Sequence, residues 1–310
     1  MSVTPVPTRA VVQRRRRSKL QRRQTVLAWI FLLPALAVVA FVAFYPLGKT
    51  VYYSFTDQQF LSGLQPTKWI GLRNYKDLIH DTDFRHSIWV TVKFTLITVS
   101  IEFVLGMIIA LVVNSNFKGR GMMRGVMLVP WAIPTVVAAQ MWKWMYDDVF
   151  GVINDASVHR LHLLHHSVAW ISQPSTALGA VCAVDIWKTT PFVALLLLAG
   201  LQVIPNELYE AARVDGASAL QQFWRITLPL LRPAILVALI FRTLDALRVF
   251  DIFNVFFGSR TDTQTMAIYD QNTIVSIGDV GYGSAISVAI FVIIGLFVVV
   301  YAVAVRVDEG

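Results

Sequence analysis

Six stretches of this chain are each long and apolar enough to cross the hydrocarbon core of a bilayer, which takes about 20 helical residues. They span residues 26–48, 88–113, 123–145, 177–203, 233–257 and 284–305. Of the 310 residues, 56% are apolar and only 15% are charged, whereas a soluble domain of this size surrounds its core with charged side chains. The sequence therefore predicts an all-α integral membrane protein with six transmembrane helices.

Four prolines interrupt these stretches: Pro34, Pro130, Pro134 and Pro191. Neighbouring helices can satisfy the carbonyl groups that a proline leaves free, and broken helices often mark a transport pathway. Ordinary packing kinks explain each proline equally well.

The positive charge of the chain is concentrated before the first apolar stretch. Of the net charge of +8, a large part comes from eight Lys and Arg residues within 1–25. Such a cluster can bind nucleic acid, but directly ahead of a hydrophobic segment it more often sets membrane orientation. We therefore expect a basic cytoplasmic tail at 1–25, no nucleic-acid partner, and a transmembrane domain at 26–310. The run after the tail is too long for a cleaved signal peptide, so we expect a retained first span.

Charge counts predict the orientation of the spans. With the N-terminus inside, the cytoplasmic segments hold 15 Lys and Arg and the outer segments hold 7, five of them in the longest outer loop. A cytoplasmic excess is what the positive-inside rule requires. The prediction is a multi-pass membrane protein with both ends in the cytoplasm, and the family resemblance described below implies the plasma membrane of a prokaryote.

Two features suggest metal or thiol chemistry only weakly. The second outer loop contains His159, His162, His165 and His166, whose spacing on a helix would bring three imidazoles together. They lack a carboxylate or cysteine partner, so an exposed polar loop is the preferred interpretation and no metal site is assigned. Cys182, the only cysteine, lies in an apolar stretch and is expected to serve packing.

The segment between the fourth and fifth apolar stretches predicts two short helices joined by a sharp turn. Asn206 is placed to cap the first helix, and Gly216 can adopt the left-handed conformation that ends it. Ser218 and Gln221 have the spacing of a capping box for the second helix.

The same segment carries a specific motif. Glu210-Ala211-Ala212, three further residues, Gly216, nine more and then Ile226-x-Leu228-Pro229 resembles the EAA loop of the permease subunits of ABC importers. The triplet alone is common in helices, but the full spacing between two apolar stretches is not. The resemblance implies that loop 204–232 is a cytoplasmic coupling helix seated in a cleft of an ATPase, through Glu210, Ala211, Ala212, Asp215 and Gly216. The alternative is a plain helical hairpin between spans.

The resemblance covers most of the chain from Val26 to Arg306 and is closest to binding-protein-dependent carbohydrate permeases of the maltose/trehalose type. Its further segments are Tyr45-Pro46-Leu47, Gly71-Leu72-x-Asn74-Tyr75, Gly119-Arg120-Gly121, Pro130-Trp131-x-x-Pro134, Phe150–Asn154, Ile186–Phe192 and Phe241–Asp251. The third outer loop departs from the family, with Gly258-Ser259-Arg260 where Gly-Gly-Pro is usual.

Ionisable side chains inside apolar stretches are energetically costly, so they face a cavity or one another. They occur at Lys93, Glu102, Lys143, Asp185, Lys188, Arg242, Asp245, Arg248 and Asp251. Asp185 and Lys188 lie one helical turn apart, as do Arg242 and Asp245, so each pair shares a face. A structural salt-bridge network and contact with a substrate both account for such pairs. Balanced charge favours a neutral ligand rich in hydroxyls, with an aromatic ring from Trp142, Trp144, Trp187 or Phe192 against it.

By resemblance, the sugar site lies in the middle of the spans before and after the coupling loop. The positions that match are Asp185, Lys188, Thr189, Arg242 and Asp245, with Gln140 of the third span as an addition. The resemblance implies an importer that also contains a second permease, an ABC ATPase dimer and an extracytoplasmic binding protein. The substrate expected is a disaccharide such as trehalose or maltose, with glycerol-3-phosphate or a polyol as the alternative.

The chain is not expected to be an enzyme or to bind a cofactor. It contains no Gly-x-x-x-x-Gly-Lys-Ser/Thr loop, so ATP and Mg²⁺ would bind the partner ATPase. A membrane-embedded transferase that uses Asp185, Asp245 or the histidines is a second hypothesis, without a nucleophile motif to support it. An ion-coupled transporter is a third, and the sequence shows no inverted repeat of the kind common in that class.

Overall fold

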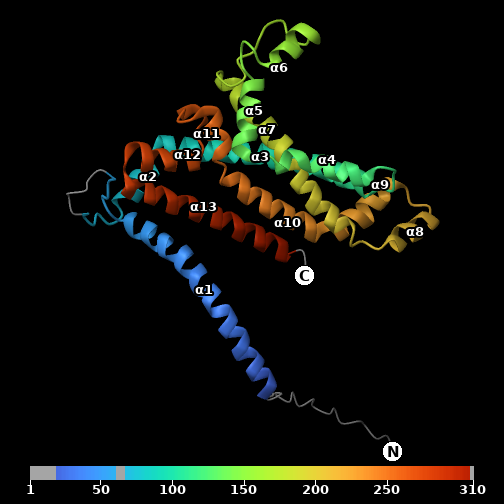
Figure 1. Ribbon diagram of the computed structural model, residues 1–310, viewed down its shortest axis with the longest axis horizontal. Coiled ribbons are helices and arrows are strands. Elements are labelled where there is room, and N and C mark those ends of the chain that lie inside the picture. Colours follow the sequence, from blue (N-terminus) through green and yellow to red (C-terminus); the bar gives the residue numbers. More distant parts are fainter. Residues whose placement is uncertain (1–18, 61–66, 308–310) are drawn as a thin grey trace, which may run out of the picture. The chain divides into compact units, whose positions relative to one another are not determined.

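The computed structural model describes residues 19–60 and 67–307, and these are nearly all helical (Figure 1). The α-helices are α1 (Lys19–Tyr53), α2 (Arg73–His80), α3 (Thr82–Asn114), α4 (Arg120–Ala132), α5 (Thr135–Met145), α6 (Val152–Asn154), α7 (Pro174–Leu201), α8 (Asn206–Val214), α9 (Ala219–Gln222), α10 (Leu228–Leu247), α11 (Asp251–Phe257), α12 (Met266–Gln271) and α13 (Val280–Val307). Short π-helical turns at Asp155–Arg160, Phe223–Thr227 and Asn272–Ile277 and a 3₁₀ turn at Thr261–Thr263 complete the set. Most of the basic tail predicted at 1–25 lies outside the described residues.

The chain divides into two units, the first of which ends at Tyr52 and contains nearly all of α1. The 35 residues of α1 include Pro34 and Pro46 without a break in the helix. Its apolar side chains point in all directions and are exposed over the whole of 23–49. A helix that is apolar all round requires lipid or other protein around it, as expected of a membrane span.

Four helices are long and apolar enough to cross a membrane: Arg23–Tyr53 within α1, α3, α7, and Val280–Tyr301 within α13. They contain nearly all of the predicted spans 26–48, 88–113, 177–203 and 284–305, with ends that differ by a few residues. Pro191 lies within an unbroken α7, so it does not interrupt that span.

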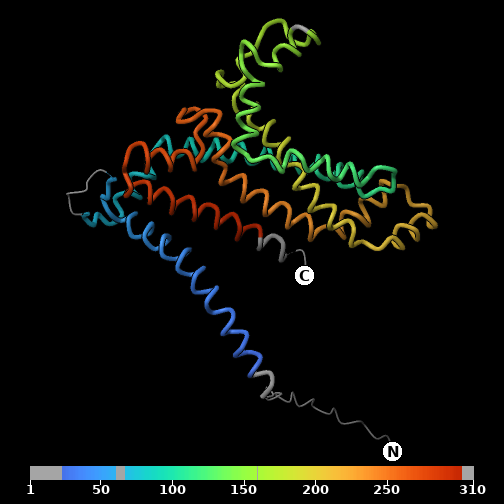
Figure 2. The backbone as a smooth tube through the Cα atoms, in the orientation of Figure 1, coloured from blue at the N-terminus to red at the C-terminus, as the bar shows by residue number. Residues whose placement is uncertain are grey.

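The third predicted span, 123–145, is not a single helix. α4 and α5 meet at an angle of 87°, and Figure 2 shows the sharp turn of the backbone between them. Ile133 is extended at φ −71° and ψ 130°, and Pro134 precedes the first residue of α5. The residue before a proline is pushed out of the helical region, which explains the break here. Together the two helices form at most one broken span.

The fifth predicted span, 233–257, also requires correction. Its helix, α10, begins earlier at Leu228 and ends at Leu247, and residues 248–250 separate it from the short α11. Because α10 carries Arg232, Arg242 and Asp245, it is not among the long apolar helices. The part of the chain that the structure describes therefore contains four such helices, or five with the bent pair.

Within the second unit, α3, α7 and α10 pack on one another. Small residues at the contacts allow their backbones to approach, as is typical of membrane helices. A Cβ atom on Gly200 of α7 would lie 2.4 Å from the Cβ atom of Ala234 on α10, and one on Gly106 of α3 would lie 2.9 Å from Cγ1 of Val193 on α7. These contacts fix how the three helices face one another.

The start of α3 is joined to α12 and α13 through one carboxylate. Asp81 caps α3 by accepting hydrogen bonds from the backbone N–H groups of Asp83 at 2.9 Å and Phe84 at 3.0 Å. Its other oxygen accepts hydrogen bonds from the hydroxyls of Tyr269 and Tyr282, each at 2.5 Å. Burial raises the pKa of Asp81, but these hydrogen bonds outweigh it and hold the pKa below its ordinary value. In Figure 1, α2 and α12 lie at one end of the bundle and α8 and α9 at the opposite end.

Candidate substrate cavity and coupling loop

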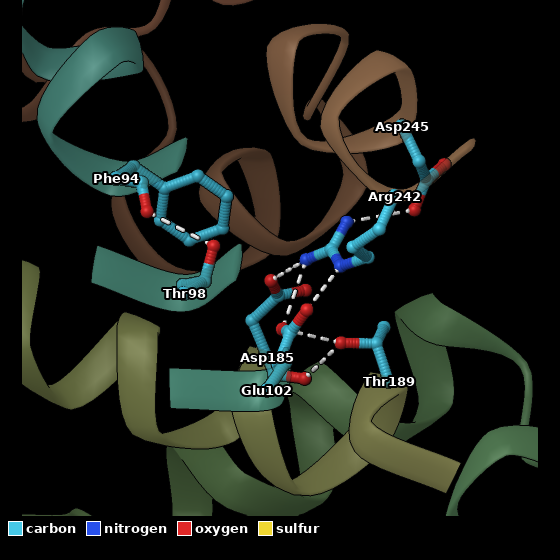
Figure 3. A network of polar contacts seen from close by, with 7 residues as sticks. All are labelled: Phe94, Thr98, Glu102, Asp185, Thr189, Arg242 and Asp245. Atoms are coloured by element: carbon cyan, nitrogen blue, oxygen red, sulfur yellow. Dashed lines mark hydrogen bonds and ion pairs between the residues drawn. The ribbon is translucent and has the colours of Figure 1, made fainter. Parts of the chain in front are cut away.

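Three helices bring ionisable side chains to the middle of the bundle. α7 supplies Asp185 and Thr189 on one face, α10 supplies Arg242, and α3 supplies Glu102. The spacing of four residues between Asp185 and Thr189 corresponds to about one helical turn, so both point toward α10 and α3. Figure 3 shows these side chains converging on the Arg242 guanidinium.

Arg242 is bound by three carboxylates. Its Nε and Nη2 donate to the two oxygens of Glu102, Nη2 also donates to Asp185, and Nη1 donates to Asp245 at 3.0 Å. Thr189 donates to Glu102 at 2.6 Å and to the Asp185 carbonyl at 2.7 Å. The side chains of Arg242, Glu102 and Asp185 are 3%, 0% and 9% exposed, whereas that of Asp245 is 75% exposed. Buried charges persist when they are paired and hydrogen-bonded, and this arrangement meets both conditions.

The observed pairing differs in part from the predicted one. The expected Arg242–Asp245 pair is present. Asp185 instead faces Arg242, and among the described residues Lys188 makes no ion pair with it. Glu102, which the sequence identified as an intramembrane charge but not as a site residue, completes the network. Only the packing of α3 against α10 reveals its role, because the two residues lie 140 positions apart.

A cavity of about 290 Å³ lies directly beside this network. Its wall contains five of the six residues predicted to bind substrate, together with seven more: Asp185, Lys188, Thr189, Arg242, Asp245, Trp131, Thr135, Arg248, Val249, Phe250, Asp251 and Ile252. Gln140 is not in the wall; it is exposed on α5, beyond the 87° bend. The bend was not anticipated, and it separates Gln140 from the residues around Trp131.

The aromatic rings at the cavity are not the expected ones. Trp131 and Phe250 line it, and Trp131 stacks on Phe192 with ring centroids 5.8 Å apart. Trp142 packs edge-on against Trp187 at 5.3 Å, away from the cavity wall. Trp144, also a candidate, is 72% exposed and does not line the cavity.

The formal charges in the cavity wall balance. Asp185, Asp245 and Asp251 face Lys188, Arg242 and Arg248. Lys188 is 7% exposed and is not within ion-pair distance of any described carboxylate. The cavity therefore offers both hydrogen-bond donors and acceptors beside an aromatic surface, which is the chemistry that binds a polyhydroxylated molecule.

The predicted coupling loop forms two short helices with a defined turn. Gly216 has φ +79°, its N–H donates to the Arg213 carbonyl at 3.1 Å, and the N–H of Ala217 donates to the Ala212 carbonyl at 2.8 Å. These two bonds are the Schellman pattern that ends a helix with a left-handed glycine. Ser218 and Gln221 form the predicted capping box. Asn206 does not cap α8; it is the first helical residue, and Pro205 holds the cap position.

The residues predicted to contact an ATPase are accessible on this loop. Glu210, Ala211, Asp215 and Gly216 are exposed and Ala212 is half-buried. Tyr209, which lies among them, is within hydrogen-bond distance of Thr227 at 3.0 Å between hydroxyl oxygens and anchors α8 to the following turn. The loop thus presents a small-residue surface with two carboxylates.

The other candidates remain without a site. Among the side chains that the structure describes, no group of three or more His, Cys, Asp and Glu could hold a metal ion. The side chain of His159 lies outside the described set. Cys182 is 3% exposed within the apolar core, as its packing role predicts.

Known proteins resemble this chain along most of its length. A trehalose/maltose transport system permease protein, MalF of Thermococcus litoralis, is 44% identical over 292 residues, covering 92% of this chain and 95% of its own. A sulfoquinovosyl glycerol transport system permease protein, SmoG of Agrobacterium fabrum, is 41% identical over 286 residues and covers 92% of each chain.

The fold also matches a solved structure. A chain of a bacterial ABC transporter that imports the acidic polysaccharide alginate superposes with a TM-score of 0.79 over 93% of this chain and 99% of its own, at 22% identity. The profile of the family described as "Binding-protein-dependent transport system inner membrane component" matches residues 102–309, which include the Arg242 network, the cavity and the coupling loop. This chain belongs to that family of inner membrane transport components.

Proposed function

We propose that this chain is the permease subunit of an ATP-driven importer and forms half of the path for a sugar, namely a disaccharide such as trehalose or maltose. The observation that carries the proposal is the charge-balanced cavity between α7 and α10, the helices on either side of the coupling loop. The MalF relative is named for trehalose and maltose transport, and the SmoG relative for sulfoquinovosyl glycerol transport.

The state of Arg242 favours a neutral ligand over an anion. An arginine that grips a phosphate presents its planar fork of N–H groups to the oxygens. In this chain all three nitrogens of that fork donate to Glu102, Asp185 or Asp245. The remaining cations of the wall, Lys188 and Arg248, are free to meet an anion, so glycerol-3-phosphate is the second candidate, with a polyol as the uncharged alternative.

The proposed topology has six spans with both termini in the cytoplasm. α10 joins the long apolar helices as the fifth span because Arg242 and Asp245 are paired within the bundle, which reduces the cost of placing them in the membrane. The bent pair α4–α5 is the third span, and loop 204–232 faces the cytoplasm.

The proposed assembly contains a second, homologous permease, a dimer of ABC ATPases and an extracytoplasmic binding protein. The exposed surface of Glu210, Ala211, Asp215 and Gly216 would contact the ATPase, which binds ATP and Mg²⁺. This chain would undergo alternating access and catalyse no reaction, so it is neither a transferase nor an ion-coupled transporter.

The test is transport by the complete complex in proteoliposomes. The chain is purified with its partner permease, ATPase and binding protein, and uptake of labelled trehalose, maltose, sulfoquinovosyl glycerol and glycerol-3-phosphate is measured with and without ATP. ATP-dependent uptake of a disaccharide supports the proposal. Preference for glycerol-3-phosphate would replace the sugar assignment, and uptake that survives without ATP would contradict the ABC mechanism.

A further inference from the structure

A second cavity, of about 520 Å³, lies between the α10–α11 link, α12 and α13. None of the residues predicted to bind substrate lies in its wall. Its surface is mainly apolar, with polar groups from Arg248, Asp270, Gln271 and Ser287. A large, mostly apolar cavity with a few polar groups is a typical ligand site.

Asp270 is the polar group that most needs a partner. Its Oδ2 accepts a hydrogen bond from the Ser287 hydroxyl at 2.7 Å. Its Oδ1 is buried and receives no hydrogen bond from the described residues. Burial raises the pKa of the Asp270 carboxyl to about 6, while the Ser287 hydrogen bond acts in the opposite direction. A buried carboxylate oxygen without a donor is costly, so the site is completed when a ligand supplies one.

The two cavities adjoin. Arg248 and Phe250, which follow the end of α10, belong to the walls of both cavities, so the two cavities lie next to each other. Arg248 is exposed and makes no ion pair with Asp270 among the described residues, although both line the second cavity. A donor and an acceptor that face one cavity without meeting can be bridged by a ligand with several hydroxyls.

We propose that the second cavity binds the second ring of the sugar, so that a disaccharide spans both cavities and a monosaccharide fills only the first. Asp270 accepts a hydroxyl hydrogen bond through Oδ1, Arg248 donates at the junction, and Phe250 packs against a ring face. The inference rests on the sugar substrate proposed above. It adds the reason why the permease would bind a disaccharide in preference to a monosaccharide.

The test measures binding to the detergent-solubilised complex of this chain with its partner permease and the ATPase dimer, without the binding protein, so that only the permeases select the sugar. Labelled trehalose, maltose and glucose are titrated against wild type and against Asp270→Asn, Asp270→Ala and Ser287→Ala, with concentrations referred to monodisperse complex. We expect the Asp270 variants to weaken disaccharide binding about tenfold, the equivalent of about 1.4 kcal/mol and of one hydrogen bond to a charged group, and to leave glucose binding unchanged. Ser287→Ala is expected to act in the same direction with a smaller effect.

Asp83→Asn is the matched control, since Asp83 is an exposed carboxylate in neither cavity wall. An equal loss of glucose and disaccharide binding in the Asp270 variants, or no loss of either, would overturn the second-ring assignment. A wild-type complex that binds none of the three sugars would instead overturn the proposed substrate class, so the two failures are distinguishable.

Discussion

Arg242 neutralises a cluster that the bundle could not otherwise bury. Glu102 and Asp185 are nearly inaccessible, and each makes a direct bond to the same guanidinium. Two carboxylates this close repel one another unless a cation lies between them. The network is therefore first a structural requirement of α3, α7 and α10, and its exposed member, Asp245, lines the cavity together with Lys188 and Arg248.

Arg242→Gln is expected to lower the amount of folded protein in the membrane. It leaves two buried carboxylates uncompensated, and breaking a buried pair in this way costs about 3–5 kcal/mol. The double variant Glu102→Gln/Arg242→Gln should recover part of the loss, because one of those charges is removed as well. Quantitative blotting of membrane fractions measures this, with Arg248→Gln as the control for a nearby exposed cation. An Arg242→Gln variant as abundant as wild type would show that the network is not structural.

Asp245→Asn is expected to have the opposite profile. Its side chain lines the cavity and is 75% exposed, so solvent screens the change and the protein should accumulate normally. Sugar uptake should fall, because a weakened hydroxyl contact costs roughly 1–3 kcal/mol. Asp185→Asn should lower membrane abundance less than Arg242→Gln does and more than Asp245→Asn does. Arg242 keeps two carboxylates in this variant, but the cavity loses one. Parallel loss of abundance and uptake, with unchanged activity per folded complex, would remove Asp245 from the substrate site.

At the scale of elements, glycines decide both the contact between α7 and α10 and the end of α8, the proposed coupling helix. Gly200 allows α7 to approach α10, and Gly216 supplies the left-handed residue after α8. Gly200 must lack a Cβ atom because Ala234, which is distant in the sequence, lies against it. Gly216 must lack a Cβ atom because of its backbone conformation alone.

Gly200→Ala should destabilise the bundle by about 1–3 kcal/mol, as expected for overpacking. Gly179→Ala in the same helix is the matched control, since a Cβ atom there would meet nothing within 4 Å. Thermal unfolding of the purified complex in detergent measures the difference. Equal midpoints for the two variants would mean that α7 and α10 adjust without cost.

Gly216→Val should distort the Schellman turn, because a β-branched residue at positive φ is strongly disfavoured. Gly216→Asn, which tolerates the left-handed conformation, should retain most of the function. We expect the valine variant, like Glu210→Lys, to reach the membrane but to lose sugar-stimulated ATP hydrolysis. Full coupling in Gly216→Val and in Glu210→Lys would exclude this loop from the mechanism.

At the scale of the whole molecule, the second unit has two opposite ends formed by different short helices. α8 and α9 lie at one end and α2 and α12 at the other (Figure 1). α13 runs from the α2–α12 end toward the α8–α9 end. The topology proposed above places the α8–α9 end on the cytoplasmic side, and the Lys and Arg excess behind that proposal comes from the eight basic residues of segment 1–25.

Cysteine labelling tests this orientation in intact cells. In a Cys182→Ala background, a cysteine at Ser218 should resist an impermeant thiol reagent and one at Ser167 should react. Both positions are exposed, so access depends on the side of the membrane. Disruption of the cells should make Ser218→Cys reactive, which controls for a buried thiol. Labelling from outside at Ser218→Cys would contradict the proposed topology.

What the sequence by itself determined are the features encoded within a few helical turns. The long apolar helices α1, α3, α7 and α13, the glycine turn at Gly216 and the capping box at Ser218 each depend on neighbours in the chain, so local pattern predicts them. Five of the six residues predicted to bind substrate line one cavity: four of them stand out in the sequence because charge within an apolar stretch is unusual, and Thr189 was assigned by family resemblance.

The tertiary structure alone decided which of those charges meet. Glu102 reaches Arg242 across 140 residues, the bend between α4 and α5 removes Gln140 from the cavity, and the link at 248–250 brings Arg248 and Phe250 to its wall. Electrostatic pairing depends on distance in space, and a short apolar sequence does not specify which face of one helix will lie against another. Those contacts follow from how α3, α7 and α10 interlock, through side chains and glycines that lie far apart in the chain.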